Sequence, residues 1–175
     1  MIQSVVTYHG GMQAIGYEWG SPNHHGPPSD PKADQSPDDL ANKLIAGSMQ
    51  VLGGYDKREG NKRRGFKEAY PIGPINTIIY PVDGGMEDWM YAAGWDNATP
   101  TLSRKCVVNS VTSIPENKAL VFLIETTDMK TPPNADLGGS EGVLNHNAAT
   151  PDAGVAGGNG HVPRNIRTTL VAIDT

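Results

Sequence analysis

The sequence contains a single cysteine, Cys106, among its 175 residues. One cysteine excludes a disulfide bond within the chain and a zinc site built from several cysteines. Long apolar runs are also lacking, because none approaches the roughly 20 residues that a membrane-spanning helix needs. Positive charge is in deficit, with a formal net charge of −5, which gives no general attraction to nucleic acids or to anionic membranes. We therefore expect neither a membrane span nor a nucleic-acid partner.

Glycine and proline are abundant, at 21 and 14 residues of 175, and this composition favours many loops over long helices. The length is that of one domain with a buried core. The N-terminus lacks the charged start and apolar centre of a signal peptide, so the sequence leaves the cellular compartment open.

Apolar and turn patterns predict a small number of elements. A β-branched strand over Ile2–Tyr8 delivers His9 at its C-terminal end. A helix follows Ser36, with Ser36 as N-cap and Pro37 at the first helical position, and it ends at residues 53–54. Its apolar face is expected to point into the core, so that Leu44→Ala would cost about 2 to 4 kcal/mol. That face comprises Leu40, Leu44, Ile45, Met49, Val51 and Leu52.

Further elements follow from the same patterns. They are a short strand over Asn76–Tyr80, one or two helical turns over Met86–Ala93, strands over Val107–Ser113 and Ala119–Thr126, and a helix over Arg164–Ile173. The basic segment 56–68 lacks apolar periodicity and is expected to be a solvated loop. Nucleic-acid binding is its less favoured interpretation, because Phe66 is the only aromatic residue among the charges and the whole chain is acidic.

One segment joins a strand end, a turn and a helix start within ten residues, Tyr80-Pro-Val-Asp-Gly-Gly-Met-Glu-Asp-Trp89. Two glycines tolerate positive φ and allow other groups to approach the backbone closely. Glu87 and Asp88 then fall in the first helical turn, where the helix dipole favours carboxylates. A turn of this kind, with an aromatic residue and an acid beside it, is typical of a site.

This decapeptide resembles a signature of the zinc metallocarboxypeptidases, in particular of the branch that contains carboxypeptidases D, E, N and M. Two further stretches agree in order and approximate spacing, Tyr8-His9-Gly10-Gly11 and Ala119-Leu-Val-Phe-Leu-Ile-Glu125, so that the resemblance covers roughly residues 2–127. It implies an α/β fold, with a mixed, mostly parallel sheet and helices on both faces. It also implies Zn²⁺ and hydrolysis of C-terminal residues from peptides or proteins, and a secreted or vesicular location.

The resemblance assigns roles to three residues. His9 occupies the place of a zinc ligand, Glu125 that of the general base, and Tyr80 that of a tyrosine that contacts the substrate carboxylate. Each has a plainer interpretation. His9 would be a strand-end histidine bonded to a backbone carbonyl, Glu125 a strand-end acid, and Tyr80 a packed aromatic residue.

Two acids are candidates for substrate binding. Glu87 corresponds to a residue at the base of the side-chain pocket in relatives, where a carboxylate would favour C-terminal Lys or Arg. The alternative is a helix N-terminal acid that faces solvent. Basic-specific relatives also carry an aspartate where this chain has Gly20, and Glu18 is the nearest acid to that position, so the preference for basic ends stays open.

The family's His-x-x-Glu motif, which supplies the other two zinc ligands, occurs nowhere in the chain. We therefore expect the C-terminal part of one catalytic domain over residues 1–175, with the missing half or self-association as partner and with little activity by itself. The alternative function is a non-catalytic, carboxypeptidase-like module that binds peptides or proteins. A zinc site made from His9 with His24 or His25 has no recognised ligand spacing.

Overall fold

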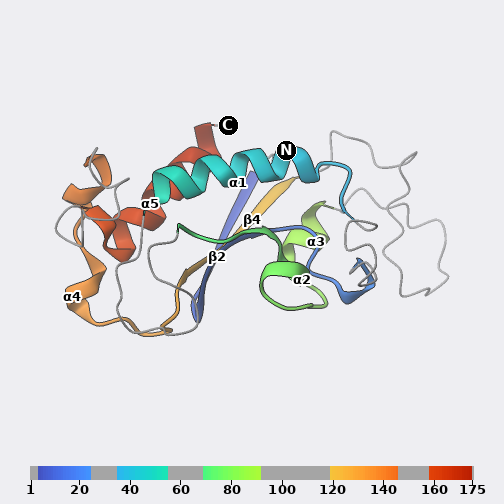
Figure 1. Ribbon diagram of the computed structural model, residues 1–175, viewed down its shortest axis with the longest axis horizontal. Helices are drawn as coiled ribbons and strands as arrows, with labels where there is room; N and C mark the ends of the chain where they lie inside the picture. Colours follow the sequence, from blue (N-terminus) through green and yellow to red (C-terminus); the bar gives the residue numbers. More distant parts are fainter. Residues whose placement is uncertain (1–3, 25–34, 55–68, 92–118, 146–157, 175) are drawn as a thin grey trace.

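The computed structural model describes residues 4–24, 35–54, 69–91, 119–145 and 158–174 (Figure 1). The basic segment 56–68 and the predicted strand Val107–Ser113 lie outside these residues, so both interpretations stay predictions. No helix in the described part of the chain is long and apolar enough to cross a membrane.

A four-stranded mixed sheet forms the centre, in the order β1-β4-β2-β3. Strand β1 pairs in parallel with β4, β2 pairs antiparallel with β4, and β3 pairs in parallel with β2. The predicted α/β class and partial mixed sheet are confirmed. The strands are β1 (Ser4–His9), β2 (Met12–Tyr17), β3 (Ile72–Pro74) and β4 (Leu120–Thr127), of which β2 and β3 were not predicted.

Helices cover both faces of the sheet. Helices α1 (Asp39–Gly53) and α5 (His161–Asp174) pack against each other on one face (Figure 1). The short helix α2 (Ile75–Ile78) lies on the other face, because Ile75 packs against Gly16, which alternates with the inward-facing residues of β2. The remaining helical segments are α3 (Met86–Tyr91), α4 (Asn134–Leu137) and two 3₁₀ turns, η1 (Pro22–His24) and η3 (Ser140–Leu144).

The main core lies between the sheet and the two long helices. Ile15, Phe122 and Ile124 point from alternate strand positions toward Met49 of α1 and Ala172 of α5. Full burial of a side chain as large as Phe, Ile or Met stabilises the fold by about 1.5 to 3 kcal/mol. The core therefore fixes the sheet and, with it, the relative positions of the strand ends.

Helix α1 corrects the predicted apolar face. Leu40, Leu44 and Val51 are exposed, with Leu44 at 66%, so Leu44→Ala would open no cavity. The buried residues are Asn42, Ala46, Met49 and Gly53. The reason is close approach, since a Cβ on Gly53 would lie 2.7 Å from Thr168 Cγ2 of α5, and the small residues let the helices meet. The predicted N-cap is also wrong, because the helix begins at Asp39 and Asp38 is its N-cap.

The predicted strand Asn76–Tyr80 is likewise wrong, since Ile75–Ile78 form the helical turn α2. Tertiary contacts decide this segment. The Asn76 backbone N–H donates to Trp19 O at 2.9 Å and its side-chain amide donates to Ser21 O at 3.2 Å. A run rich in isoleucine has strand propensity, but these contacts outweigh it.

Arg167 of α5 joins three separate segments. Its guanidinium donates to the carbonyls of Leu52 and Gly53 at the end of α1, and to those of Gly142 and Gly158, at 2.7 to 2.9 Å. Burial, followed by the neighbouring Arg164, lowers the pKa of Arg167. This arginine therefore anchors the predicted C-terminal helix, which begins at His161, three residues before the predicted start.

Candidate active site

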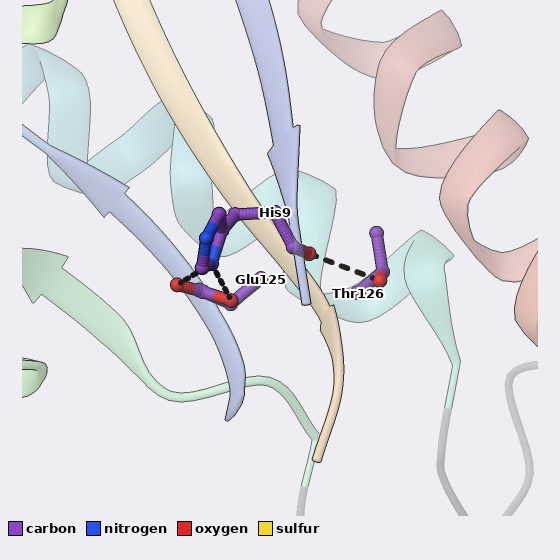
Figure 2. A network of polar contacts seen from close by, with 3 residues as sticks. All are labelled: His9, Glu125 and Thr126. Atoms are coloured by element: carbon purple, nitrogen blue, oxygen red, sulfur yellow. Dashed lines mark hydrogen bonds and ion pairs between the residues drawn. The ribbon is translucent and has the colours of Figure 1, made fainter. Parts of the chain in front are cut away.

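His9 and Glu125 meet at one edge of the sheet (Figure 2). The two residues are direct partners in the register between β1 and β4. His9 Nδ1 lies 2.9 Å from Glu125 Oε1 and 3.1 Å from Oε2, with the imidazole 55% exposed and the carboxylate 5% exposed. A solvent-accessible imidazole thus faces a buried carboxylate that comes from a strand more than a hundred residues away in the sequence.

Strand geometry explains why these side chains converge. Parallel neighbours in a sheet lie about 4.8 Å apart, and partners in register point to the same face. Thr126, one position after Glu125, points to the other side of the strands, where its hydroxyl donates to His9 O at 3.0 Å (Figure 2). The Thr126 hydrogen bond therefore fixes the end of β1 on one face of the sheet, and the His9 imidazole projects from the opposite face.

The His9 ring has two nitrogens with different surroundings. A carboxylate only accepts hydrogen bonds, so Nδ1 carries the proton that it shares with Glu125. In the neutral imidazole the lone pair is then on Nε2, which is the nitrogen left for a metal ion or a proton. A metal bound to Nδ1 would have to displace the Glu125 contact.

The described residues do not complete a catalytic zinc site. Such a site needs three protein ligands. Within the described ranges no group of three or more His, Cys, Asp or Glu side chains is arranged to hold a metal ion. His9 can supply one ligand, and the donors around it fall short of the set that zinc requires.

Tyr80 lies apart from this pair, at the start of the ten-residue signature segment. Its side chain is 57% exposed, and it forms no hydrogen bond with the described part of the chain. The turn after it is anchored to the segment that follows β2, since Val82 N donates to Gly20 O at 2.7 Å. Of the two glycines in this turn, Gly84 has φ +76°, a backbone conformation that glycine adopts without strain.

Glu87 and Asp88 are both buried at the start of α3. Asp88 accepts hydrogen bonds from the backbone N–H groups of Gly20 and Ser21, each at 2.7 Å, and so joins α3 to the segment after β2. Burial raises the pKa of Asp88, although the two N–H donors act against that rise. Burial also raises the pKa of Glu87. A solvent-facing Glu87 is therefore excluded.

The Glu87 carboxylate lies directly beside Gly20. A Cβ built on Gly20 would be only 2.7 Å from Glu87 Oε1. The glycine at this position thus leaves the space that the carboxylate uses. The alternative to a substrate-binding role is now a structural one, in which Glu87 fills this gap.

Glu18 is fully buried between the end of β2 and the start of α1. Its Oε1 accepts hydrogen bonds from Ser36 Oγ at 2.8 Å and Asn42 Nδ2 at 2.5 Å, while Oε2 has no partner in the described residues. Burial raises the pKa of Glu18 to about 8. The sequence analysis did not predict this network. The one signal for it was that Asn42, a polar residue, lies four positions before Ala46 and therefore on the same face of α1, which is buried.

Four of the five predicted site residues therefore occupy two regions. His9 and Glu125 are in contact, whereas Glu18 and Glu87 belong to the region around Gly20. Continuing the antiparallel register of β2 and β4 places Glu18 level with Val121, four residues before Glu125. That separation is roughly 13 Å along the strand at about 3.3 Å per residue.

Comparison with known proteins adds one match. A family model described as zinc carboxypeptidase matches residues 1–133, which include β1 to β4 and all five predicted site residues. No curated protein matches the chain.

Proposed function

Because the chain belongs to the zinc carboxypeptidase family, we propose that His9 and Glu125 form part of a catalytic centre that removes residues from the C-termini of peptides or proteins. The contact between these two side chains carries the proposal. It brings an accessible imidazole and a buried carboxylate to one strand edge, in the places where the family resemblance puts a zinc ligand and a general base.

The roles follow from the chemistry of each group. His9 would be one ligand of Zn²⁺, which when bound lowers the pKa of a coordinated water to about 7 and polarises a carbonyl. Glu125 would take a proton on a carboxylate oxygen and return it to the leaving amine. Because the described donors are too few, the other ligands would come from residues outside those described, consistent with a chain that forms one part of a larger catalytic unit.

Glu125 could instead orient His9. Histidine ligands commonly donate their second ring N–H to a carboxylate, which fixes the ring. If the metal binds His9 Nε2, the observed contact between His9 Nδ1 and Glu125 is kept, and Glu125 orients the ring. If the metal binds Nδ1, that contact is lost, and Glu125 is available as a general base. Zinc affinity distinguishes the two roles, because only the orienting role makes metal binding depend on the contact between His9 and Glu125.

We propose that the C-terminal residue of the substrate binds in the region around Gly20. Glu87 places a carboxylate against Gly20, where basic-specific relatives carry an aspartate, and this favours C-terminal Lys or Arg. Glu18 is less suited, since neutral donors already bind its buried carboxylate. Tyr80 is exposed and therefore free to move toward a substrate carboxylate. The ten-residue signature supports the branch of carboxypeptidases D, E, N and M.

The test is zinc stoichiometry and peptide hydrolysis, measured on the purified chain and on any longer product of its gene. We expect one tightly bound zinc in the form that carries all ligands, and its loss in His9→Ala. His24→Gln is the matched control, because it removes another imidazole from a different part of the fold. Circular dichroism of each variant checks folding.

Glu125→Gln then separates the two roles of Glu125. A general base predicts that zinc affinity is kept and hydrolysis is lost. An orienting partner predicts a 10- to 100-fold loss of zinc affinity. If no form of the protein binds zinc, the catalytic proposal fails, and the non-catalytic peptide-binding module becomes the better account.

A further inference from the structure

A pocket of about 410 Å³ opens between the sheet and α5, on the side where the two strands of the candidate site end. Tyr8 and Thr126 line it from β1 and β4, and Asn165 and Ile166 line it from α5. Pockets that bind small molecules usually have volumes of about 300 to 1,000 Å³. The pocket is shallow and open to solvent, so its size suits a small organic ligand that stays partly exposed.

The pocket lies behind the His9–Glu125 pair. Tyr8 directly precedes His9 and Thr126 directly follows Glu125, and neighbouring residues of a strand point to opposite faces. Figure 2 shows Thr126 on the side of the strands away from the pair. The Tyr8 hydroxyl is held by the backbone carbonyl of Asn165 at 3.3 Å and by Thr169, so this wall is fixed to α5. A ligand here would not compete with one that binds at His9.

The lining combines an apolar wall, a polar side and one ammonium group. The polar side consists of Tyr8, Thr126, Thr127, His161 and Asn165. Leu137, Ile166 and their neighbours supply the apolar wall, and Lys130 contributes the positive charge. Its side chain lies beside the turn after β1, since a Cβ on Gly11 would be 3.4 Å from Lys130 Cε. No aspartate or glutamate lines the pocket, and within the described residues no carboxylate forms a salt bridge with Lys130.

We propose that this pocket binds a small apolar molecule that carries a carboxylate. The apolar body would lie against Leu137 and Ile166, and the carboxylate would meet the Lys130 ammonium at the rim. A cationic ligand would be repelled by Lys130, and a ligand without an apolar part would leave Leu137 and Ile166 uncovered. The site is independent of the proposed peptidase activity.

Octanoate is a suitable probe, with octanamide as its uncharged counterpart, and calorimetric titration of the full chain measures both. We expect saturable one-to-one binding of octanoate. Octanamide should bind about fivefold more weakly, because an ion pair at an exposed rim contributes at most about that factor. Lys130→Ala should remove the difference between the two probes, whereas Lys43→Ala, an exposed lysine on α1, should leave it unchanged.

The apolar wall is tested by a matched pair on one helix. Ile166→Glu places a carboxylate in the pocket and should weaken octanoate binding at least 20-fold, whereas Ile173→Glu, at an exposed position of α5, should leave it intact. If Ile166→Glu fails to fold by circular dichroism, Ile166→Ala replaces it, with an expected loss of about fivefold or more.

Three outcomes would overturn the proposal. The first is no saturable binding of octanoate by the wild-type chain at millimolar concentration. The second is equal affinity for octanoate and octanamide, which would remove the role of the carboxylate. The third is an equal loss in Ile166→Glu and Ile173→Glu, which would place the ligand elsewhere.

Discussion

Glu125, within β4, and Glu18, directly after β2, are both buried glutamates, yet their surroundings differ. Glu125 faces the imidazole of His9, which can carry a positive charge and is open to solvent on its other side. Glu18 faces Ser36 and Asn42, which are neutral donors, and the nearby carboxylates of Asp38 and Asp88 add to the effect of burial on its pKa.

The difference shows that the groups around a buried carboxylate determine whether it can exchange a proton or acts as a structural residue. A carboxylate beside an accessible imidazole can exchange a proton with a group that reaches the edge of the sheet. A carboxylate enclosed by neutral groups keeps its proton near neutral pH and acts as a hydrogen-bonded element of the core.

The largest effect is expected at Glu125. In the zinc-loaded, active form of the protein, Glu125→Gln should lower kcat by about 10²- to 10⁴-fold, because an amide cannot accept the proton. Glu141→Gln, an exposed position in η3, is the control and should leave kcat unchanged. An unchanged kcat in Glu125→Gln would mean that Glu125 is not the general base. Glu125 would then have a structural role only, as we infer for Glu18.

A smaller effect is expected from Glu18→Gln, on stability. The folded pKa of Glu18 is raised to about 8 from 4.5, so between these values the folded state holds a proton that the unfolded state has released. Stability therefore falls as pH rises through this window, by about 1.4 kcal/mol per pH unit for this group. Glutamine removes that dependence.

We expect that, between pH 5.5 and pH 8.5, the free energy of unfolding of the wild-type chain declines by roughly 3 kcal/mol more than that of Glu18→Gln. Urea denaturation at the two pH values measures the difference. Parallel changes in the two proteins would show that Glu18 is ionised in the folded state, and the contrast with Glu125 would disappear.

The smallest effect is expected from Ser36→Ala, which removes one of the two hydrogen bonds to Glu18. The loss should cost about 1 kcal/mol of stability. Because the Ser36 hydrogen bond lowers the pKa of Glu18, its removal should raise that pKa further and make the cost larger at pH 8.5 than at pH 5.5. Urea denaturation at both pH values tests this, with Ser48→Ala on the exposed side of α1 as control. An equal cost at both pH values would contradict it.

Local patterns predicted β1, β4 and the helices α1, α3 and α5, whereas the roles of His9 and Glu125 came from the family resemblance. The run before His9 and the run that ends at Glu125 read directly as strands, and their polar ends meet because the strands are parallel and in register. Local patterns failed where tertiary packing decides. The exposed Leu44 and the helical Asn76 follow from contacts with Thr168, Trp19 and other residues that no local window contains.

The chain sequence alone determined the two strand ends that carry His9 and Glu125 and a glycine-containing turn between Tyr80 and Glu87. These depend on residue type and on patterns only a few residues long. Only the tertiary structure decided that Glu18 is enclosed by neutral donors, that Glu87 fills the space beside Gly20, and that a pocket lies behind the paired strand ends. The burial of a side chain and the groups that contact it depend on which distant segments of the chain come together. Strand register and helix packing determine which segments do so.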